Sequence, residues 1–520
     1  MASRAWYVIF PKKHLAALIK LTFLCVEVGL KQPVLFVLLM IRRSKIKLGE
    51  VLSGIIVWRD MLSTLKAKLV SIWGVKKEYR LKVFYLTTTF FLFTGCQAIW
   101  RPLKTSVFAT IVGKYNVPRA KLFVVIPIIF LILLYSRLVD VLRRHQLLYC
   151  FALFHGIGGI ILYFFLKHPV YGIANTDQSS YRIFGWVFYL FLESFGAFMS
   201  ATFWAFANSI NTPKDSKNYY GIFVSGSKVG GILAAALLYV FVTYSGGAAN
   251  VVLPNSLLVG SVLLLFGAYS VYLLMKNVPG YYMHGYEVAY KAEKQRAKEK
   301  EKKKVGWVKQ SLEGLVTIVK TPYVLGIFSM IAFYEIIIVI VDYMVLLVAT
   351  NGANELTAYY ALYTLGMHSV GLVIAFLGTV PLQRFLGIRR SVVIPSILAI
   401  CLLSLALAFP TPWVLFGVFM VLRAINYGLN HPTREALYVP TTKAIKFKAK
   451  AWTDAFGSRI SKAAGSVFNI AAGGAVAPGL IFGLGLASVW LVVSNVLGKS
   501  YQKAIDEKRV IGEEAEAESL

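Results

Sequence analysis

The 520-residue sequence has few charged residues, and only 24 of its residues are acidic. Charged residues make up 15% of the chain, whereas a soluble protein contains about 25%. Hydrophobic residues instead reach 58% and the mean hydropathy is +0.66. They fall in blocks of about 20, each long enough to cross a ~30 Å hydrocarbon core. This composition excludes a soluble globular protein and predicts an all-α polytopic membrane protein.

Cysteines and catalytic motifs are also scarce. The four cysteines are scattered without a C-x-x-C pair, so neither a disulfide framework nor a metal site is expected. The sequence has no G-x-x-x-x-G-K-[ST] phosphate loop, no H-E-x-x-H and no G-x-S-x-G. These absences argue against an enzyme, against ATP hydrolysis as an energy source and against a bound cofactor. Any transport would have to be driven by exchange or by an ion gradient.

The apolar blocks predict twelve membrane-spanning helices in two sets of six. The approximate ranges are 82–112, 121–142, 147–166, 183–210, 218–243, 252–275, 323–350, 356–383, 389–409, 412–430, 452–477 and 479–498. A polar, strongly basic stretch at 291–310 separates the two sets. Two six-helix halves joined by a basic loop are typical of the major facilitator fold.

Basic residues alternate between loops in a regular way. The loops after spans 2, 4, 6, 8 and 10 are rich in Lys or Arg, and those after spans 5, 7, 9 and 11 contain neither. Because cytoplasmic loops carry the positive charge, both termini and the central loop are predicted to be cytoplasmic. The net charge of +31 then indicates loops that face anionic lipid, and no nucleic-acid partner is expected.

Composition and spans together predict five regions along the chain. They are a basic N-terminal segment at 1–80, a six-helix half at 81–276, a basic cytoplasmic linker at 277–322, a second six-helix half at 323–500 and an acidic cytoplasmic tail at 501–520. The first segment lacks the pattern of a cleaved signal peptide. It is expected to be amphipathic or membrane-associated, with an extra membrane hairpin or a transit peptide as alternatives.

Two short motifs occur once in each predicted half. "AFANSINTPKDS" at 205–216 shares A-x5-N-x-P with "AINYGLNHPTRE" at 424–435, and "SKVGG" at 227–231 is similar to "SKAAG" at 461–465. The halves therefore look like divergent copies of one unit. "YSRLVDVLRRH" at 135–145 resembles the Asp-plus-basic loop of the major facilitator fold.

Several charged residues lie within predicted spans, where each costs roughly 2.5–3.5 kcal/mol at the helix centre. They are Arg101, Lys104, Glu193, Lys228, Glu335, Asp342, His368, Arg423, Asp454, Arg459 and Lys462. Arg101 and Lys104 share one helical face, and Pro102 between them is expected to kink or unwind the helix. Cations outnumber anions, which predicts an aqueous cavity that attracts a polyanionic solute.

Structural roles remain open for some of these residues. Asp454, Arg459 and Lys462 could pair with one another, and Arg423 could be a structural partner of a neighbouring helix. His368 is expected to be a packing histidine.

Aromatic residues offer two readings. Trp100, Tyr85, Phe203 and Trp204 could stack a nucleobase, but ordinary packing is the default expectation for each of them at 14% aromatic content.

Four stretches carry a resemblance to a known family. They are "WRPLKTS" (100–106), "LESFGAFMSATFWAFANSINTPKDSKNYYGIF" (192–223), "SLEGLVTIVKTPYVLGI" (311–327) and "HPTREALYVPTTKAIKFKAKAWTDAFGSRISKAAGS" (431–466). From about residue 82 to 500 the chain resembles the ATP/ADP translocase-type nucleotide transporters of plastids and of obligate intracellular bacteria such as chlamydiae and rickettsiae. The resemblance implies a secondary transporter of nucleotides that exchanges ATP for ADP by alternating access. It also implies a multi-pass protein of a bacterial inner membrane, with the plastid envelope as the alternative.

The resemblance also implies functional residues. The family's first-span lysine falls on Lys104, its fourth-span glutamate on Glu193 and its seventh-span glutamate on Asp342, while its K-x-K-A lysines fall on Lys446, Lys448 and Lys450. Together with the in-span charges, the candidate substrate-binding residues are Arg101, Lys104, Glu193, Lys228, Asp342, Arg423, Lys446, Lys448, Lys450 and Arg459.

The chain departs from the family pattern near the expected site. Thr105 replaces an acidic residue, Asp342 is shorter than glutamate, and Val345-Leu346 replaces a common tryptophan-lysine pair. These differences keep two alternatives open. One is a proton-coupled importer of another nucleotide or phosphorylated anion, and the other is a non-transporting membrane scaffold that keeps the fold.

Overall fold

In the computed structural model the described part of the chain is helical. It comprises residues 79–283, 316–349, 352–374, 379–442, 445, 449–453 and 457–512, all within one compact unit, Lys68–Leu520. These residues contain no β-strand, only an isolated bridge between Thr441 and Ile511. The predicted segment 1–80 (except its last two residues), most of the linker 277–322 and Lys446, Lys448 and Asp454 lie outside the described residues.

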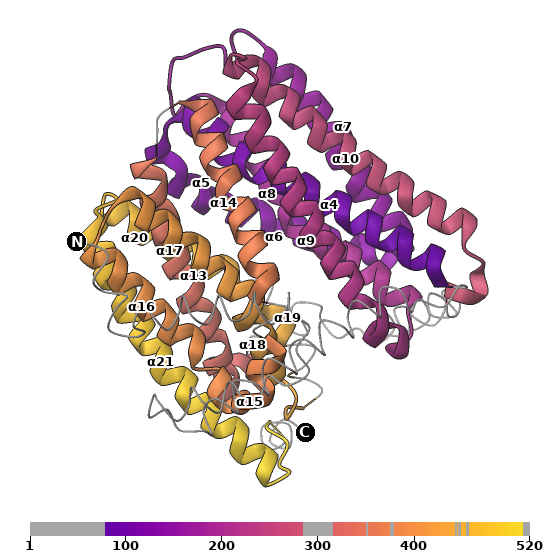
Figure 1. Cartoon of the computed structure of the whole chain (residues 1–520), viewed down its shortest axis with the longest axis vertical. Coiled ribbons are helices and arrows are strands. Elements are labelled where there is room, and N and C mark those ends of the chain that lie inside the picture. The colour runs from indigo at the N-terminus through magenta and orange to yellow at the C-terminus, as the bar shows by residue number, and fades with distance from the viewer. Residues whose placement is uncertain are drawn as a thin grey trace, which may run out of the picture. The chain divides into compact units, whose positions relative to one another are not determined.

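The first helix group is coloured indigo to magenta in Figure 1. It consists of α4 (Arg80–Phe108), η3 (Ala109–Gly113), η4 (Lys114–Asn116), α5 (Val117–Phe123), α6 (Val125–Val141), α7 (Arg144–Lys167), α8 (Ile183–Ile210), α9 (Pro213–Tyr244), α10 (Ala249–Asn277) and η5 (Gly280–Met283).

The second helix group is coloured orange to yellow (Figure 1). It consists of α13 (Pro322–Val348), α14 (Ala353–Val373), α15 (Thr379–Ser391), α16 (Ile394–Ala408), α17 (Pro412–Ile425), η7 (Asn426–Asn430), α18 (His431–Leu437), α19 (Lys450–Trp452), α20 (Ser458–Ala471) and α21 (Val476–Asp506).

The helices agree with the predicted polytopic membrane protein. Each of the twelve predicted ranges falls mainly on helix. In the described residues eight helices are long and apolar enough to cross a membrane, or nine if the pair 385–391 and 394–408, bent by 69°, is one span. The all-helical membrane architecture is therefore confirmed, while the count of twelve stays a prediction. The stretch between the predicted spans 356–383 and 389–409 lies within α15, which bends at Gly387, where φ is 72°.

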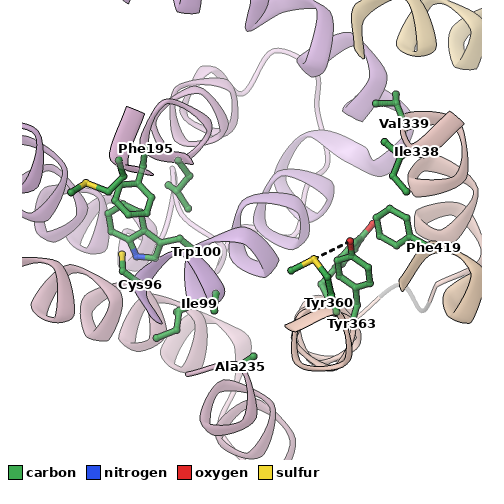
Figure 2. Packing of buried hydrophobic residues seen from close by; sticks show 14 of the residues in the cluster. Cys96, Ile99, Trp100, Phe195, Ala235, Ile338, Val339, Tyr360, Tyr363 and Phe419 are labelled. Atoms are coloured by element: carbon green, nitrogen blue, oxygen red, sulfur yellow. Dashed lines mark hydrogen bonds between the residues drawn. The ribbon is translucent and has the colours of Figure 1, made fainter. Parts of the chain in front are cut away.

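A buried apolar cluster includes residues of both helix groups, and Figure 2 shows part of it. In the first group α4 packs against α8, α9 and α10, and Trp100 meets Phe195 edge-on with ring centroids 4.9 Å apart. In the second group α13 packs against α17, α20 and α21, and Tyr363 of α14 stacks on Phe419 at 4.3 Å. Buried aromatic pairs of this kind add about 0.5–1.5 kcal/mol each beyond their burial.

The groups meet where α14 contacts α9 and α4, and where α20 contacts α5. A glycine permits the approach of α9 to α14. A Cβ at Gly231 would lie 2.8 Å from the His368 ring, closer than side chains tolerate. The predicted "SKVGG" motif thus supplies a contact point between the two groups.

The two copies of the motif that ends in N-x-P, at 205–216 and 424–435, have different local structures. In the first, Thr212 caps α9: its hydroxyl accepts from the Asp215 amide at 3.1 Å, and the Asp215 carboxylate accepts from the Thr212 amide at 3.3 Å. The buried Lys82 lies 3.7 Å from Asp215 and donates to the Ile210 carbonyl at 2.7 Å. In the second motif the chain runs without a turn from α17 through the π-helix η7 into α18.

At the end of the bundle where α4 and α13 terminate, the two groups are joined by hydrogen bonds. The Thr357 hydroxyl donates to the Ser106 hydroxyl at 2.6 Å, and both residues are fully buried. The Lys114 ammonium donates to the Leu347 carbonyl at 3.2 Å, and the Asn354 amide donates to the Gly247 carbonyl at 3.1 Å. We call this the closed end of the bundle.

Candidate functional site

Between the two helix groups lies a cavity of about 1200 Å³, which exceeds the ~300–1,000 Å³ of most small-molecule sites. Its wall includes residues of α4, α8 and α9 from the first group and of α13, α14, α17 and α20 from the second. On α4 the lining stops at Thr105, one residue before Ser106 of the closed end. The cavity therefore extends from the bundle centre toward the opposite end, where α18 and α19 also line it.

Basic residues outnumber acidic ones along this wall. The nine basic residues are Arg101, Lys104, Lys121, Lys228, Arg423, Arg434, Lys450, Arg459 and Lys462, and the four acidic residues are Glu193, Glu335, Asp342 and Glu435. Of the ten sequence-predicted site residues, Lys446 and Lys448 lie outside the described residues and the other eight line this cavity. Six of the eight are Arg101, Lys104, Glu193, Lys228, Asp342 and Arg423. Lys450 and Arg459 lie in the same wall.

The face of α4 in the cavity carries a regular series of side chains. Phe90, Thr94, Gln97, Arg101 and Lys104 all line the cavity at spacings of three or four residues, which places them on one helical face. The helix continues through Pro102 without a break. The expected unwinding at Pro102 is thus not seen, and α4 changes to the π-helix η3 only after Phe108.

Lys104 and Glu193 form an ion pair, with the ammonium 2.5 Å from the carboxylate. The guanidinium of Arg459, from the second group, lies 3.7 Å from the other oxygen of Glu193. One carboxylate therefore holds a cation from each helix group. Since these side chains are only 17–24% exposed, the pairs are poorly screened by water.

Asp342 is paired with a residue that the sequence did not single out. The Lys121 ammonium of α5 donates to the Asp342 carboxylate of α13 at 2.5 Å. This ion pair also joins the two helix groups. The pairing joins residues 221 positions apart, and nothing in a single sequence indicates it.

In the described residues the cations of α20 approach carboxylates of other helices. Arg459 lies beside Glu193, and Lys462 lies 3.9 Å from Glu335, whose other oxygen accepts a hydrogen bond from the Ser458 hydroxyl at 3.0 Å. The pairing of these cations with Asp454 stays a prediction, because Asp454 lies outside the described residues. Lys450, of the K-x-K-A segment, pairs with Glu435 at 2.5 Å.

Three cations in the cavity have no carboxylate oxygen within 4 Å in the described part of the chain: Arg101, Lys228 and Arg423. They surround Tyr427, which the π-helix η7 carries. The Lys228 ammonium lies 5.3 Å from the Tyr427 ring centroid, and the Arg101 guanidinium donates to the Met367 sulfur at 3.6 Å. Within the described residues the buried Nε of Arg423 has no hydrogen-bond partner. We call Arg101, Lys228 and Arg423 the unpaired cation cluster.

Buried charges without counterions are strongly unfavourable. The unpaired cation cluster draws Arg101 and Lys228 from the first group and Arg423 from the second. A ligand with several negative charges would neutralise it and at the same time hold the two groups together. The sequence analysis did not select Tyr427 as a site residue. The structure places it in a π-helix, and π-helices often mark functional positions.

The remaining candidates divide between packing and the cavity. Trp100 and Phe203 are buried, as the packing interpretation expects, whereas the partly exposed Trp204 lines the cavity. His368 also lines the cavity and packs on Gly231, and its Nδ1 has no hydrogen-bond partner among the residues that the structure describes.

Comparison with solved structures identifies the fold. A xylose transporter from E. coli in an inward-open conformation aligns with a TM-score of 0.52 at 14% identity, covering 81% of this chain and 95% of the transporter. A bacterial metal transporter aligns with a TM-score of 0.50 at 12% identity, covering 82% of this chain and 100% of that protein. The major-facilitator-like architecture predicted from the sequence is confirmed.

Comparison with protein sequences identifies the family. The ADP,ATP carrier protein 4 of Rickettsia bellii is 22% identical over 447 residues, which cover 76% of this chain and 84% of the carrier. The chloroplastic ADP,ATP carrier protein 2 of Arabidopsis thaliana is 23% identical over 510 residues, covering 86% of this chain and 79% of the carrier. The family model described as TLC ATP/ADP transporter matches residues 60–409. The chain therefore belongs to the TLC ATP/ADP transporter family.

Proposed function

We propose that this protein exchanges ATP for ADP across a membrane and that the cavity between the helix groups is its nucleotide site. The observation that carries the proposal is the unpaired cation cluster, which lies in a cavity large enough for a nucleotide. Guanidinium groups form paired hydrogen bonds with phosphate, and a lysine adds a point charge. Arg101, Lys228 and Arg423 are therefore assigned to the phosphates.

The paired charges would act in the transport cycle. Glu193 keeps Lys104 and Arg459 in place while the site is empty. Incoming phosphates compete with the carboxylate for these cations, so substrate binding changes the contacts between the two groups. A ligand shifts a conformational equilibrium only through such differential contacts. The two predicted halves, 81–276 and 323–500, would then rock about the central site.

The charge pattern of the loops indicates which side of the membrane the cavity faces. The closed end carries the loops without Lys or Arg, and these are predicted to lie outside the cytoplasm. The cavity of this structure would then face the cytoplasm, where both termini are proposed to lie. A bacterial inner membrane or a plastid envelope would suit the proposal, since relatives come from rickettsiae and from a chloroplast.

Exchange in proteoliposomes tests the function. We expect labelled ATP to enter vesicles that contain ADP and not empty vesicles, because exchange returns one nucleotide for each that enters. Uptake into empty vesicles that follows an imposed pH gradient would instead support the proton-coupled importer. Absence of nucleotide uptake under every gradient, with the purified protein folded, would overturn nucleotide transport and favour the scaffold.

Replacing Arg101 with glutamine should weaken ATP binding by about 10–100-fold. A hydrogen bond to a charged group contributes about 1.5–3 kcal/mol, and 1.4 kcal/mol corresponds to a factor of about ten. Thermal stabilisation by ATP in detergent measures the affinity.

Arg119→Gln is the matched control for this variant. Arg119 is exposed on α5, hydrogen-bonds to Asn116 and does not line the cavity, so its variant should bind ATP like the parent. Equal ATP affinities of Arg101→Gln and the parent would remove Arg101 from the site.

A further inference from the structure

The walls of the cavity on α4 and α8 face each other in three tiers. The first tier is the ion pair of Lys104 with Glu193. In the second, Gln97 faces Gly196. A Cβ added at Gly196 would lie 3.5 Å from the Gln97 amide nitrogen. We call the third, formed by Phe90 and Trp204 with ring centroids 5.5 Å apart, the aromatic tier. All of these residues line the cavity.

The aromatic tier presents a ring to the cavity. Trp204 is held edge-on by Phe90 and Phe203 and lies 5.0 Å from the Tyr220 ring. These contacts fix its orientation, but Trp204 itself remains partly exposed. On the same helix the exposed Ser200 and Ala201 line the cavity beside it and leave room. A rigid, partly exposed indole is a suitable surface for a flat ring.

The middle tier supplies an amide without a partner. In the described part of the chain the side chain of Gln97 makes no hydrogen bond, although it can donate two and accept two. Gly196 keeps the space opposite it open, because any larger side chain there would occupy the volume in front of the amide. Gln97 is therefore available to a ligand.

The spacing along α4 connects these tiers to the phosphate site. Gln97 precedes Arg101 by four residues, which is about 6 Å along the helix axis. Phe90 lies a further two turns toward the open end of the cavity. A nucleotide with its phosphates on the unpaired cation cluster would place its base between Gln97 and Trp204.

We propose that Gln97 and Trp204 form a nucleobase subsite, with Trp204 stacking on the base and Gln97 pairing with its edge. This inference rests on the proposed nucleotide transport and specifies which part of the substrate each tier contacts. Adenine offers a donor beside an acceptor, the pattern that a glutamine amide matches with two hydrogen bonds. Aromatic stacking adds affinity for any base, so the pair would favour nucleotides over their phosphate chain alone.

Binding of ATP and of inorganic tripolyphosphate to the full-length protein in detergent separates the tiers. Gln97→Leu should weaken ATP binding about tenfold, because the hydrogen bonds to the base are lost, and leave tripolyphosphate binding unchanged. Arg101→Gln should weaken the binding of both ATP and tripolyphosphate. Gln502→Leu is the matched control, because Gln502 lies partly exposed on α21, donates a hydrogen bond to Asp506 and does not line the cavity. This variant should bind both ligands like the parent.

A second pair of variants tests the stacking surface. Trp204→Phe should keep most of the ATP affinity. Trp204→Ala should bind ATP about tenfold more weakly or worse, as expected for removal of a stacking ring. Gly196→Val fills the space in front of the Gln97 amide. It should reproduce the loss of ATP affinity seen in Gln97→Leu although neither Gln97 nor Trp204 is replaced. Melting temperatures without ligand show whether each variant is folded.

The outcomes distinguish this subsite from the proposed function. If Gln97→Leu binds ATP like the parent, or weakens ATP and tripolyphosphate alike, the nucleobase subsite is overturned while nucleotide transport stands. If the folded parent binds neither ATP nor any other nucleoside triphosphate, the proposed function itself is overturned. The subsite is supported if ATP affinity falls while tripolyphosphate affinity is unchanged in Gln97→Leu, Trp204→Ala and Gly196→Val.

Discussion

Lys104→Ala is expected to reduce ATP–ADP exchange by about 100-fold or more. The substitution leaves the Glu193 carboxylate with one cation within 4 Å in the described part of the chain, Arg459 at 3.7 Å. Breaking a buried ion pair costs about 3–5 kcal/mol, and about 1.4 kcal/mol equals a factor of ten. Part of that cost falls on substrate binding, because an uncompensated carboxylate repels phosphate. Initial rates of labelled ATP uptake into ADP-loaded proteoliposomes measure the loss.

The control for this prediction is Lys167→Ala. Lys167 lies at the end of α7, hydrogen-bonds to Tyr163 and does not line the cavity, so its removal should leave exchange unchanged. The exchanged pair Lys104→Glu with Glu193→Lys separates two roles. Partial recovery of uptake shows that the ion pair positions the cavity wall, and no recovery indicates that Lys104 itself contacts the phosphates. Parent-like kinetics of Lys104→Ala would contradict both roles.

The sequence could predict the residues of this site better than their partners. Lys104 and Glu193 stand out because charges are costly in apolar spans, and the structure indeed brings them together. Lys121 has no such signal, since it opens a predicted span where a lysine is ordinary. Its partner Asp342 is 221 residues away, and only the packing of α5 beside α20 and of η4 beside α13 decides which charges meet.

Local backbone geometry was also not predicted from the sequence. The two copies of the A-x5-N-x-P motif look alike, yet the first forms a capped turn before α9 and the second a π-helix. That π-helix carries Tyr427 to the unpaired cation cluster. The second copy has His431 and Arg434 where the first has Thr212 and Asp215, so it lacks the two side chains that form the cap of α9.

Lys121→Gln is expected to open the closed end. The ion pair between Lys121 and Asp342 links α5 to α13, and both side chains are at most 21% exposed. Its loss removes a poorly screened attraction between the two helix groups and shifts the population toward the state open on that side. We therefore expect a cysteine at position 106, in Ser106→Cys, to react at least about tenfold faster with a membrane-impermeant thiol reagent.

The labelling experiment uses a background in which Cys25, Cys96, Cys150 and Cys401 are replaced by serine or alanine. In that background Ser106→Cys should be almost unreactive, because residue 106 is fully buried at the junction with Thr357.

A second lysine–carboxylate pair provides the comparison. Lys503 and Glu507 lie 3.8 Å apart on the surface of α21, where both side chains are well exposed. An exposed pair of this kind contributes about 0–1 kcal/mol, so Lys503→Gln should not change the labelling of position 106. If Lys121→Gln also leaves the labelling rate unchanged, the hydrogen bonds of Thr357, Lys114 and Asn354 suffice to hold that end shut. In that case Asp342 contributes to the cavity through its charge alone, and the conformational change must depend on the Glu193 pairs.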